Sequence, residues 1–199
     1  MEDPDTALMM RFKGGDSRAF EELVRRNTAI VHALVYRFLS DPDQVDDVTQ
    51  EVFLRVYRAA KNYQPSAKFS TWLYRIVANL SFNVMRSRRH VPLTQLQIFA
   101  HEEDDAPRDD IPDCHEPTPA QYLGALELNE KVAQAVEGLP DTQRFAIVLN
   151  KYEHKSLEEI ANILDCSAMA VKSLLNRARA NLRRSLGPYL GPSGEKKND

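Results

Sequence analysis

The stretch AKFSTWLYRIVANLSFNVMRSRR, residues 67 to 89, predicts a helix with two different faces. Its apolar side chains recur every three or four residues, which is the spacing of a helix that packs against a core. They are Leu73, Val77, Leu80 and Val84. The adjacent face combines an aromatic ring with amides and cations, and it contains no carboxylate. It consists of Trp72, Arg75, Asn79, Asn83 and Arg86.

Charge is segregated along the chain, although the formal net charge of its 199 residues is only −3. No Asp or Glu occurs in residues 52–101, which hold eight cations, or in residues 166–194, which hold five. The intervening stretch 101–116 carries eight acids and one arginine. Two basic segments separated by an acidic one indicate contacts with a polyanion at two places. The alternative is a pair of solvated helix faces whose acids are supplied by neighbours in space.

Several classes of protein are disfavoured by the composition. The two cysteines form no CxxC pair, which fits a reducing cytoplasm, and Cys114-His115 lacks the spacing of a metal site. The acidic N-terminus has no signal-peptide pattern, and no apolar run is long enough to span a membrane. There is no phosphate-binding glycine loop, and the histidines are scattered. We therefore expect a cytoplasmic protein that is no enzyme, with no metal, cofactor or membrane partner.

Helical periodicity dominates the sequence and predicts an all-α fold. A short helix over residues 5–13 ends at Gly14-Gly15, and Asp16 or Ser17 caps a long second helix whose apolar positions include Ile30. Asp41-Pro42 opens a third helix, and Ser70 is the predicted cap of the fourth. The predicted organisation is two small helical domains and a tail. The boundaries are 5–89 for the first domain, 90–117 for a flexible acidic linker, 118–187 for the second domain and 188–199 for a disordered tail.

The segment SLEEIANILDCSAMAVKSLLNRARANLRR, residues 156 to 184, has the pattern of a helix-turn-helix. A three-residue turn, Asp165 to Ser167, separates two amphipathic helices, and Ser167 can cap the second helix. Such a helix fits the major groove of duplex DNA. The alternative is an amphipathic bundle helix with a basic surface. The candidate duplex-binding residues are Ser167, Lys172, Ser173, Asn176, Arg177 and Arg179.

The chain resembles the extracytoplasmic-function (ECF) sigma factors of the sigma-70 family over about residues 6–187. EIANILDCSAMAVKSLLNRARANLRR is similar to their promoter-reading helix-turn-helix. DPDQVDDVTQEVFLRVYRA and FSTWLYRIVANLSFNVMRSRR are similar to their polymerase-binding and promoter-opening segments. Where the family often has Gly-Thr, this chain has Met169-Ala170, and Leu174 stands where Arg is frequent. These departures affect the predicted promoter sequence more than the groove-binding role.

The resemblance implies a sigma factor that directs core RNA polymerase to promoter DNA and nucleates strand opening without ATP. The first domain would bind the β′ clamp helices and the minus-ten element, and the second would bind the β flap and the minus-thirty-five element. The family also implies an anti-sigma factor as a further partner. The acidic linker would thread through polymerase channels that otherwise hold RNA, and the alternative is that it is only a solubilising spacer. The alternative function is a helix-turn-helix regulator that binds duplex DNA only.

The first domain contains two sets of candidate contact residues, one for single-stranded DNA and one for polymerase. Aromatic rings and amides can hold bases taken out of the stack, while cations hold the backbone. The candidate single-strand contacts are Tyr63, Phe69, Trp72, Arg75, Asn79, Asn83 and Arg86, with core packing as the alternative role for Trp72. The candidate polymerase contacts are Asp46, Asp47, Gln50, Glu51, Phe53 and Leu54, although acids early in a helix also stabilise its dipole.

Overall fold

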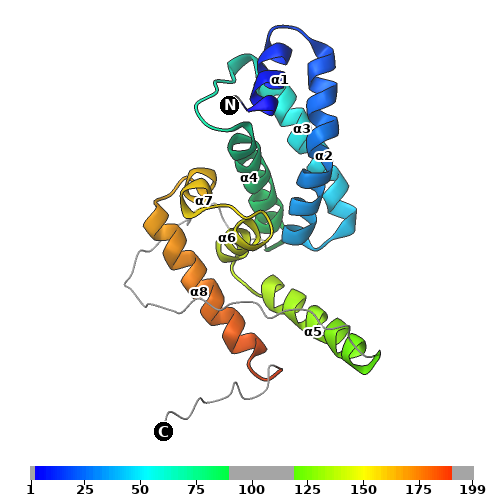
Figure 1. Ribbon diagram of the computed structural model, residues 1–199, viewed down its shortest axis with the longest axis vertical. Helices are drawn as coiled ribbons and strands as arrows, with labels where there is room; N and C mark the ends of the chain where they lie inside the picture. Colours follow the sequence, from blue (N-terminus) through cyan, green and yellow to red (C-terminus); the bar gives the residue numbers. More distant parts are fainter. Residues whose placement is uncertain (1–2, 90–118, 190–199) are drawn as a thin grey trace.

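The computed structural model describes residues 3–89 and 119–189, and every regular element in these two ranges is a helix (Figure 1). The first range contains α1 (Pro4–Lys13), α2 (Ser17–Leu39), α3 (Pro42–Ala59), the 3₁₀ helix η1 (Ala60–Asn62) and α4 (Phe69–Arg89). The second contains α5 (Pro119–Glu137), α6 (Asp141–Lys151), α7 (Leu157–Leu164) and α8 (Ala168–Leu186). The predicted all-α class is thus confirmed for the described ranges. The predicted linker, and the predicted tail from residue 190 onward, lie outside them.

Local capping explains where most helices begin. The side chains of Asp16, Asp41 and Ser167 accept backbone N–H groups at the starts of α2, α3 and α8, as their sequence positions predict. The prediction for the fourth helix was wrong, because α4 begins at Phe69 and Ser70 lies inside it. The backbone N–H of Phe69 instead donates to Asp3 Oδ2 at 2.7 Å. The acceptor at the start of α4 therefore comes from a residue 66 positions earlier in the chain.

Helices α1 to α4 pack around one apolar core. Leu23, Val31, Val52 and Leu73 are fully buried there. Ile30, which we predicted to be a core residue, has 43% of its surface exposed. Successive helical residues are rotated by about 100°, so the burial of Val31 turns its neighbour toward solvent.

The second set of helices rests on the first, and the buried apolar residues of both sets form one continuous cluster. In Figure 1 α7 lies beside α4 and α6 lies near the lower ends of α2 and α4, and contacts link α6 to both of these helices and α7 to α4. Phe145 of α6 packs on Phe38 of α2 and Phe82 of α4, with ring centroids 5.1 and 5.3 Å away. The two sequence domains therefore share a continuous apolar contact.

A buried arginine reinforces this contact. Arg144 is almost fully buried, and its Nη1 donates to the carbonyl oxygen of Phe38 at 2.6 Å. Its Nη2 donates to the carbonyl oxygen of Glu137. A buried charge is costly unless it is hydrogen-bonded, so these carbonyls are essential partners of the guanidinium. Loss of the contact between α2 and α6 would remove the hydrogen bond from Arg144 to the Phe38 carbonyl.

We predict that Phe145→Ala lowers the free energy of unfolding by about 3–5 kcal/mol, because it removes a fully buried ring and leaves a cavity. Urea denaturation followed by circular dichroism measures the change. The matched control is Ile30→Ala, which removes an exposed apolar side chain from a helix and should alter the free energy by less than about 0.5 kcal/mol. An unchanged midpoint for Phe145→Ala would contradict the packing described here.

Candidate nucleic-acid interface

The outer face of α4 is cationic and rich in amides, as the sequence predicts. Arg75, Asn79 and Asn83 are exposed, whereas Trp72 and Arg86 are half-buried. Within this set, Arg86 Nη1 donates to Asn83 Oδ1 at 3.5 Å. No acid lies in α4 itself. The face thus offers hydrogen-bond donors, amide groups and positive charge to whatever lies against it.

The aromatic residues at the head of α4 form a packed cluster. The ring centroids of Tyr63 and Trp72 are 4.9 Å apart, and those of Phe69 and Trp72 are 5.6 Å apart. Tyr63 is 3% exposed and Phe69 is fully buried, so in this conformation neither ring has a free face on which a base can stack. Burial also raises the pKa of the Tyr63 hydroxyl. Direct stacking by these two rings does not fit this geometry, and only Trp72 retains partial access.

Helix α7 covers part of the α4 face. Arg75 Nη2 donates to the carbonyl oxygen of Asn162 in α7, and Lys68 Nζ lies 3.4 Å from Glu159 Oε1. A pocket opens between the two units beside Asn79. Its walls include Arg75, Asn79 and Phe82 from the first unit and Leu164, Asp165 and Cys166 from the second. The polar face predicted to bind a strand is therefore partly occupied by the chain itself.

Glu153, in the connection between α6 and α7, binds two groups of the first unit. Its Oε2 accepts from the Tyr74 hydroxyl at 2.9 Å, and its Oε1 lies 3.4 Å from Arg37 Nη1. Burial, followed by the adjacent Glu153 carboxylate, raises the pKa of Tyr74 far above its usual range. Tyr74 is therefore a neutral donor at physiological pH. Glu153 thus fixes the second unit against both α2 and α4.

Helices α7 and α8 form the predicted helix-turn-helix. Ser156 and Glu159 make a reciprocal capping box at the start of α7, and the Ser156 N–H is the main cause of a lowered pKa at Glu159. Asp165 adopts a left-handed conformation with φ 55°, which ends α7 sharply. The Ser167 hydroxyl then accepts the Ala170 N–H at 3.1 Å and starts α8. Local capping therefore fixes the angle at which α8 leaves the turn.

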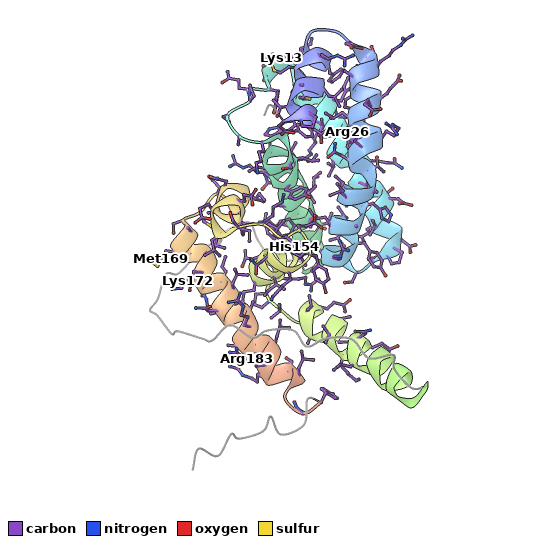
Figure 2. The ribbon with its side chains drawn as sticks, viewed as in Figure 1. Lys13, Arg26, His154, Met169, Lys172 and Arg183 are labelled. Carbon is purple, nitrogen blue, oxygen red and sulfur yellow. The ribbon has the colours of Figure 1, made fainter. Side chains whose placement is uncertain are left out.

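The outward face of α8 carries the predicted duplex-binding residues. Val171, Leu174 and Leu175 are buried, as their spacing predicts. Lys172 and Arg177 are exposed, Ser173, Asn176 and Arg179 are half-buried, and the exposed Ser167 hydroxyl is engaged as a cap. Figure 2 shows Met169, Lys172 and Arg183 in succession along this helix. Met169, which the sequence analysis did not include among the candidate contacts, is 67% exposed on the first turn of α8.

The acidic face of α3 lies on another side of the first unit. Asp46, Asp47 and Gln50 are exposed, and Glu51 forms ion pairs with Arg55 and Arg58. Two apolar residues of the predicted polymerase-binding set differ in their environment: Phe53 is buried in the core, whereas Leu54 is 48% exposed.

Phe53 is therefore too buried for direct contact in this conformation. Tyr57, one turn beyond Phe53, is an exposed apolar neighbour that the sequence analysis did not include. Its ring packs on Phe12 and Phe20 at centroid distances of 5.2 and 5.3 Å.

Residues 3–89 and 119–189 contain neither a clustered metal site nor a helix able to span a membrane. Within these ranges, no cluster of three or more His, Cys, Asp or Glu side chains is arranged to hold a metal ion. No helix there has the length and apolar character needed to cross a membrane.

Comparisons with known proteins identify the family to which the chain belongs. The family model for sigma-70 region 2 matches residues 23–91, and that for sigma-70 region 4 matches residues 129–182. The RNA polymerase sigma-H factor of Pseudomonas aeruginosa is 34% identical over 195 residues, covering 95% of this chain and 97% of the relative. The ECF RNA polymerase sigma-E factor of Escherichia coli K12 is 33% identical over 189 residues, covering 94% and 96%.

Solved structures share the fold. CnrH, in complex with the cytosolic domain of CnrY, superposes with a TM-score of 0.67 at 27% identity, covering 94% of this chain and 99% of CnrH. The sigma factor RpoE of Bartonella quintana, in complex with the anti-sigma factor NepR, gives a TM-score of 0.58 at 22% identity, covering 84% and 96%. The second likeness concerns the fold alone.

Proposed function

Since this chain belongs to the ECF group of the sigma-70 family, we propose that it directs core RNA polymerase to specific promoters and nucleates strand opening there without ATP. The observation that carries the proposal is the similarity to a sigma factor over 95% of the chain, together with the matches to sigma-70 regions 2 and 4. We assign polymerase binding and the minus-ten element to residues 5–89, and the minus-thirty-five element to residues 118–187. Like other sigma factors, it acts as an initiation factor and not as an enzyme.

Strand opening needs a surface that binds unpaired bases better than duplex. Extruding a base costs a few kcal/mol, and stacking or hydrogen bonding of the exposed base must offset that cost. The outer face of α4 has suitable groups in Arg75, Asn79 and Asn83, with the half-buried Trp72 ring at its head. The buried rings of Tyr63 and Phe69 would support Trp72 and the neighbouring loop, and would not stack on bases themselves.

Polymerase binding uses surfaces that the chain leaves uncovered. We assign the exposed acids Asp46 and Asp47, with Gln50 and Leu54, to the β′ clamp helices, and the second unit to the β flap. An anti-sigma factor would compete for these surfaces. Because α7 lies on Arg75 and beside Asn79, strand binding also requires the two units to separate. We propose that attachment of both units to polymerase supplies the free energy for this separation.

Transcription from a defined template tests the function. The purified chain, mixed with core polymerase, is expected to initiate on a fork-junction promoter whose minus-ten element is single-stranded. Asn79→Ala should weaken binding of that strand about tenfold, the effect of one lost base contact, with unchanged affinity for core polymerase. Asp47→Ala is the converse control, which should lower polymerase affinity. Duplex binding without any polymerase-dependent initiation would favour the duplex-only regulator instead.

The native thiol Cys166 reports the separation of the two units. It lies in the pocket between them, and burial, followed by the charge of Asp165, raises its pKa and slows its reaction. In a Cys114→Ser background, we expect maleimide to label Cys166 at least several-fold faster in the holoenzyme than in the free chain. Mass spectrometry of timed samples measures the rates. Equal or slower labelling in the holoenzyme would speak against separation.

Met169 is a candidate base contact of the duplex-binding helix. Residues near the start of such a helix reach base edges in the major groove, where an apolar side chain contacts the thymine methyl group. We predict that replacing one thymine of the minus-thirty-five element by uracil, which removes only that methyl, weakens binding of the unmodified chain about threefold to tenfold. Met169→Ala should lose this sensitivity to uracil. Scanning each thymine by electrophoretic mobility shift tests the prediction, and uracil sensitivity that persists in Met169→Ala refutes it.

A further inference from the structure

The loop between η1 and α4 is held at both of its ends by one helix, α1. At the start of the loop, Lys13 Nζ donates to the carbonyl oxygen of Tyr63 at 2.7 Å. At its end, Asp3 Oδ2 accepts from the backbone N–H of Phe69 at 2.7 Å. Asp3 and Lys13 are the N-cap and the last residue of α1. A ten-residue helix spans about 15 Å, so α1 is a rigid strut that joins the two ends of the loop.

Asp3 also supplies a carboxylate to the start of α4. The first N–H groups of a helix have no partner within the helix, and a carboxylate near them is favourable because of the helix dipole. The first turn of α4 contains no acid. Asp3 provides that carboxylate from a remote position in the chain, and a hydrogen bond to an ionised acceptor is stronger than a neutral one. Asp3 therefore fixes the position at which α4 starts.

Helix α1 is itself firmly docked on α2. Met9 is fully buried, and Asp5 accepts from Arg26 Nε at 2.8 Å and from Asn27 Nδ2 at 3.1 Å. Figure 2 labels Lys13, at the end of α1 near the loop, and Arg26 on α2. By contrast, residues 64–68 between the two anchors are all exposed. The loop thus has fixed ends and a solvent-facing middle.

The loop of residues 63–68 begins beside the Trp72 ring, at the head of the α4 face to which we assign strand binding. We propose that α1 holds this loop in the conformation that receives an unpaired promoter base, with Asp3 and Lys13 as positioning residues. This inference rests on the proposed function. Neither residue falls within the part of the chain that matches sigma-70 region 2, which starts at residue 23. A loop that is already ordered loses less conformational entropy when it binds a ligand, so the strut favours strand capture without touching DNA.

Two substitutions release the loop while keeping a capping residue at the start of α1, although Asp3→Ser also removes the carboxylate to which the Thr6 hydroxyl donates. Lys13→Met keeps the aliphatic stem and removes the donor to Tyr63. Asp3→Ser keeps a good N-cap for α1 but is too short to replace the carboxylate that reaches Phe69. Lys13→Arg retains a cationic donor and serves as the rescue variant. Arg26→Met removes an ion pair that holds α1 to α2 without touching the loop, and serves as the matched control.

The experiment uses holoenzyme assembled from core polymerase and each full-length variant. Fluorescence anisotropy measures affinity for a fork-junction DNA with a single-stranded minus-ten element and for a duplex that carries only the minus-thirty-five element. We expect Lys13→Met and Asp3→Ser to bind the fork on the order of tenfold more weakly, with unchanged duplex and polymerase affinities. Lys13→Arg should restore fork binding, and Arg26→Met should match the unmodified chain.

Hydrogen exchange of the free chain provides the second measurement. Amides of residues 63–69 should exchange faster in Lys13→Met and Asp3→Ser, whereas those of α2 and α3 should not change. Faster exchange with unchanged fork affinity would overturn the positioning role, and so would equal losses in Arg26→Met and Lys13→Met. If unmodified holoenzyme fails to bind the fork, the proposed function itself is wrong and the inference falls with it. The unmodified chain thus distinguishes the two failures.

Discussion

The outer face of α4 cannot be covered by α7 and by a DNA strand at the same time. Arg75 donates to the backbone of α7, and Asn79 lines the pocket beside it. Arg75 is already hydrogen-bonded to α7, and residues of α7 line the pocket beside Asn79, so a strand that contacts both of these exposed side chains must displace α7. The packing of the two units therefore controls access to the surface to which we assign strand opening.

Apolar contacts hold the closed arrangement more strongly than the ion pairs do. The pairs of Lys68 with Glu159 and of Arg37 with Glu153 have exposed cations. Pairs of this kind contribute about 0–1 kcal/mol each and weaken with salt. The contact of Phe145 with Phe38 and Phe82 is buried and insensitive to salt. Separation therefore has to be driven by new contacts elsewhere, since a change in ionic strength would alter only the weaker part of the interface.

Features decided by nearby residues could be predicted from the sequence, and features decided by distant residues could not. The starts of α2, α3 and α8 follow from Asp16, Asp41 and Ser167, each of which caps its own helix. The start of α4 depends on Asp3, which is 66 positions away. The partner of Arg75 is a backbone carbonyl 87 positions away, and a carbonyl has no signature in the sequence. Periodicity also cannot distinguish an aromatic ring that binds a base from one that packs in the core, which is why the burial of Tyr63 and Phe69 was not foreseen.

The uncovered surfaces impose an order on the proposed reaction. In the closed arrangement, Asp46 and Asp47 on α3 and Lys172 on α8 are already exposed. Polymerase and duplex DNA can therefore engage the chain before its two units separate, whereas the strand-binding face of α4 cannot be engaged fully until afterwards. A protein that exposed the α4 face first would bind any single-stranded nucleic acid through cations and amides that carry little sequence preference. Because separation follows attachment to polymerase in the proposed reaction, strand capture would be limited to chains that are already part of the holoenzyme.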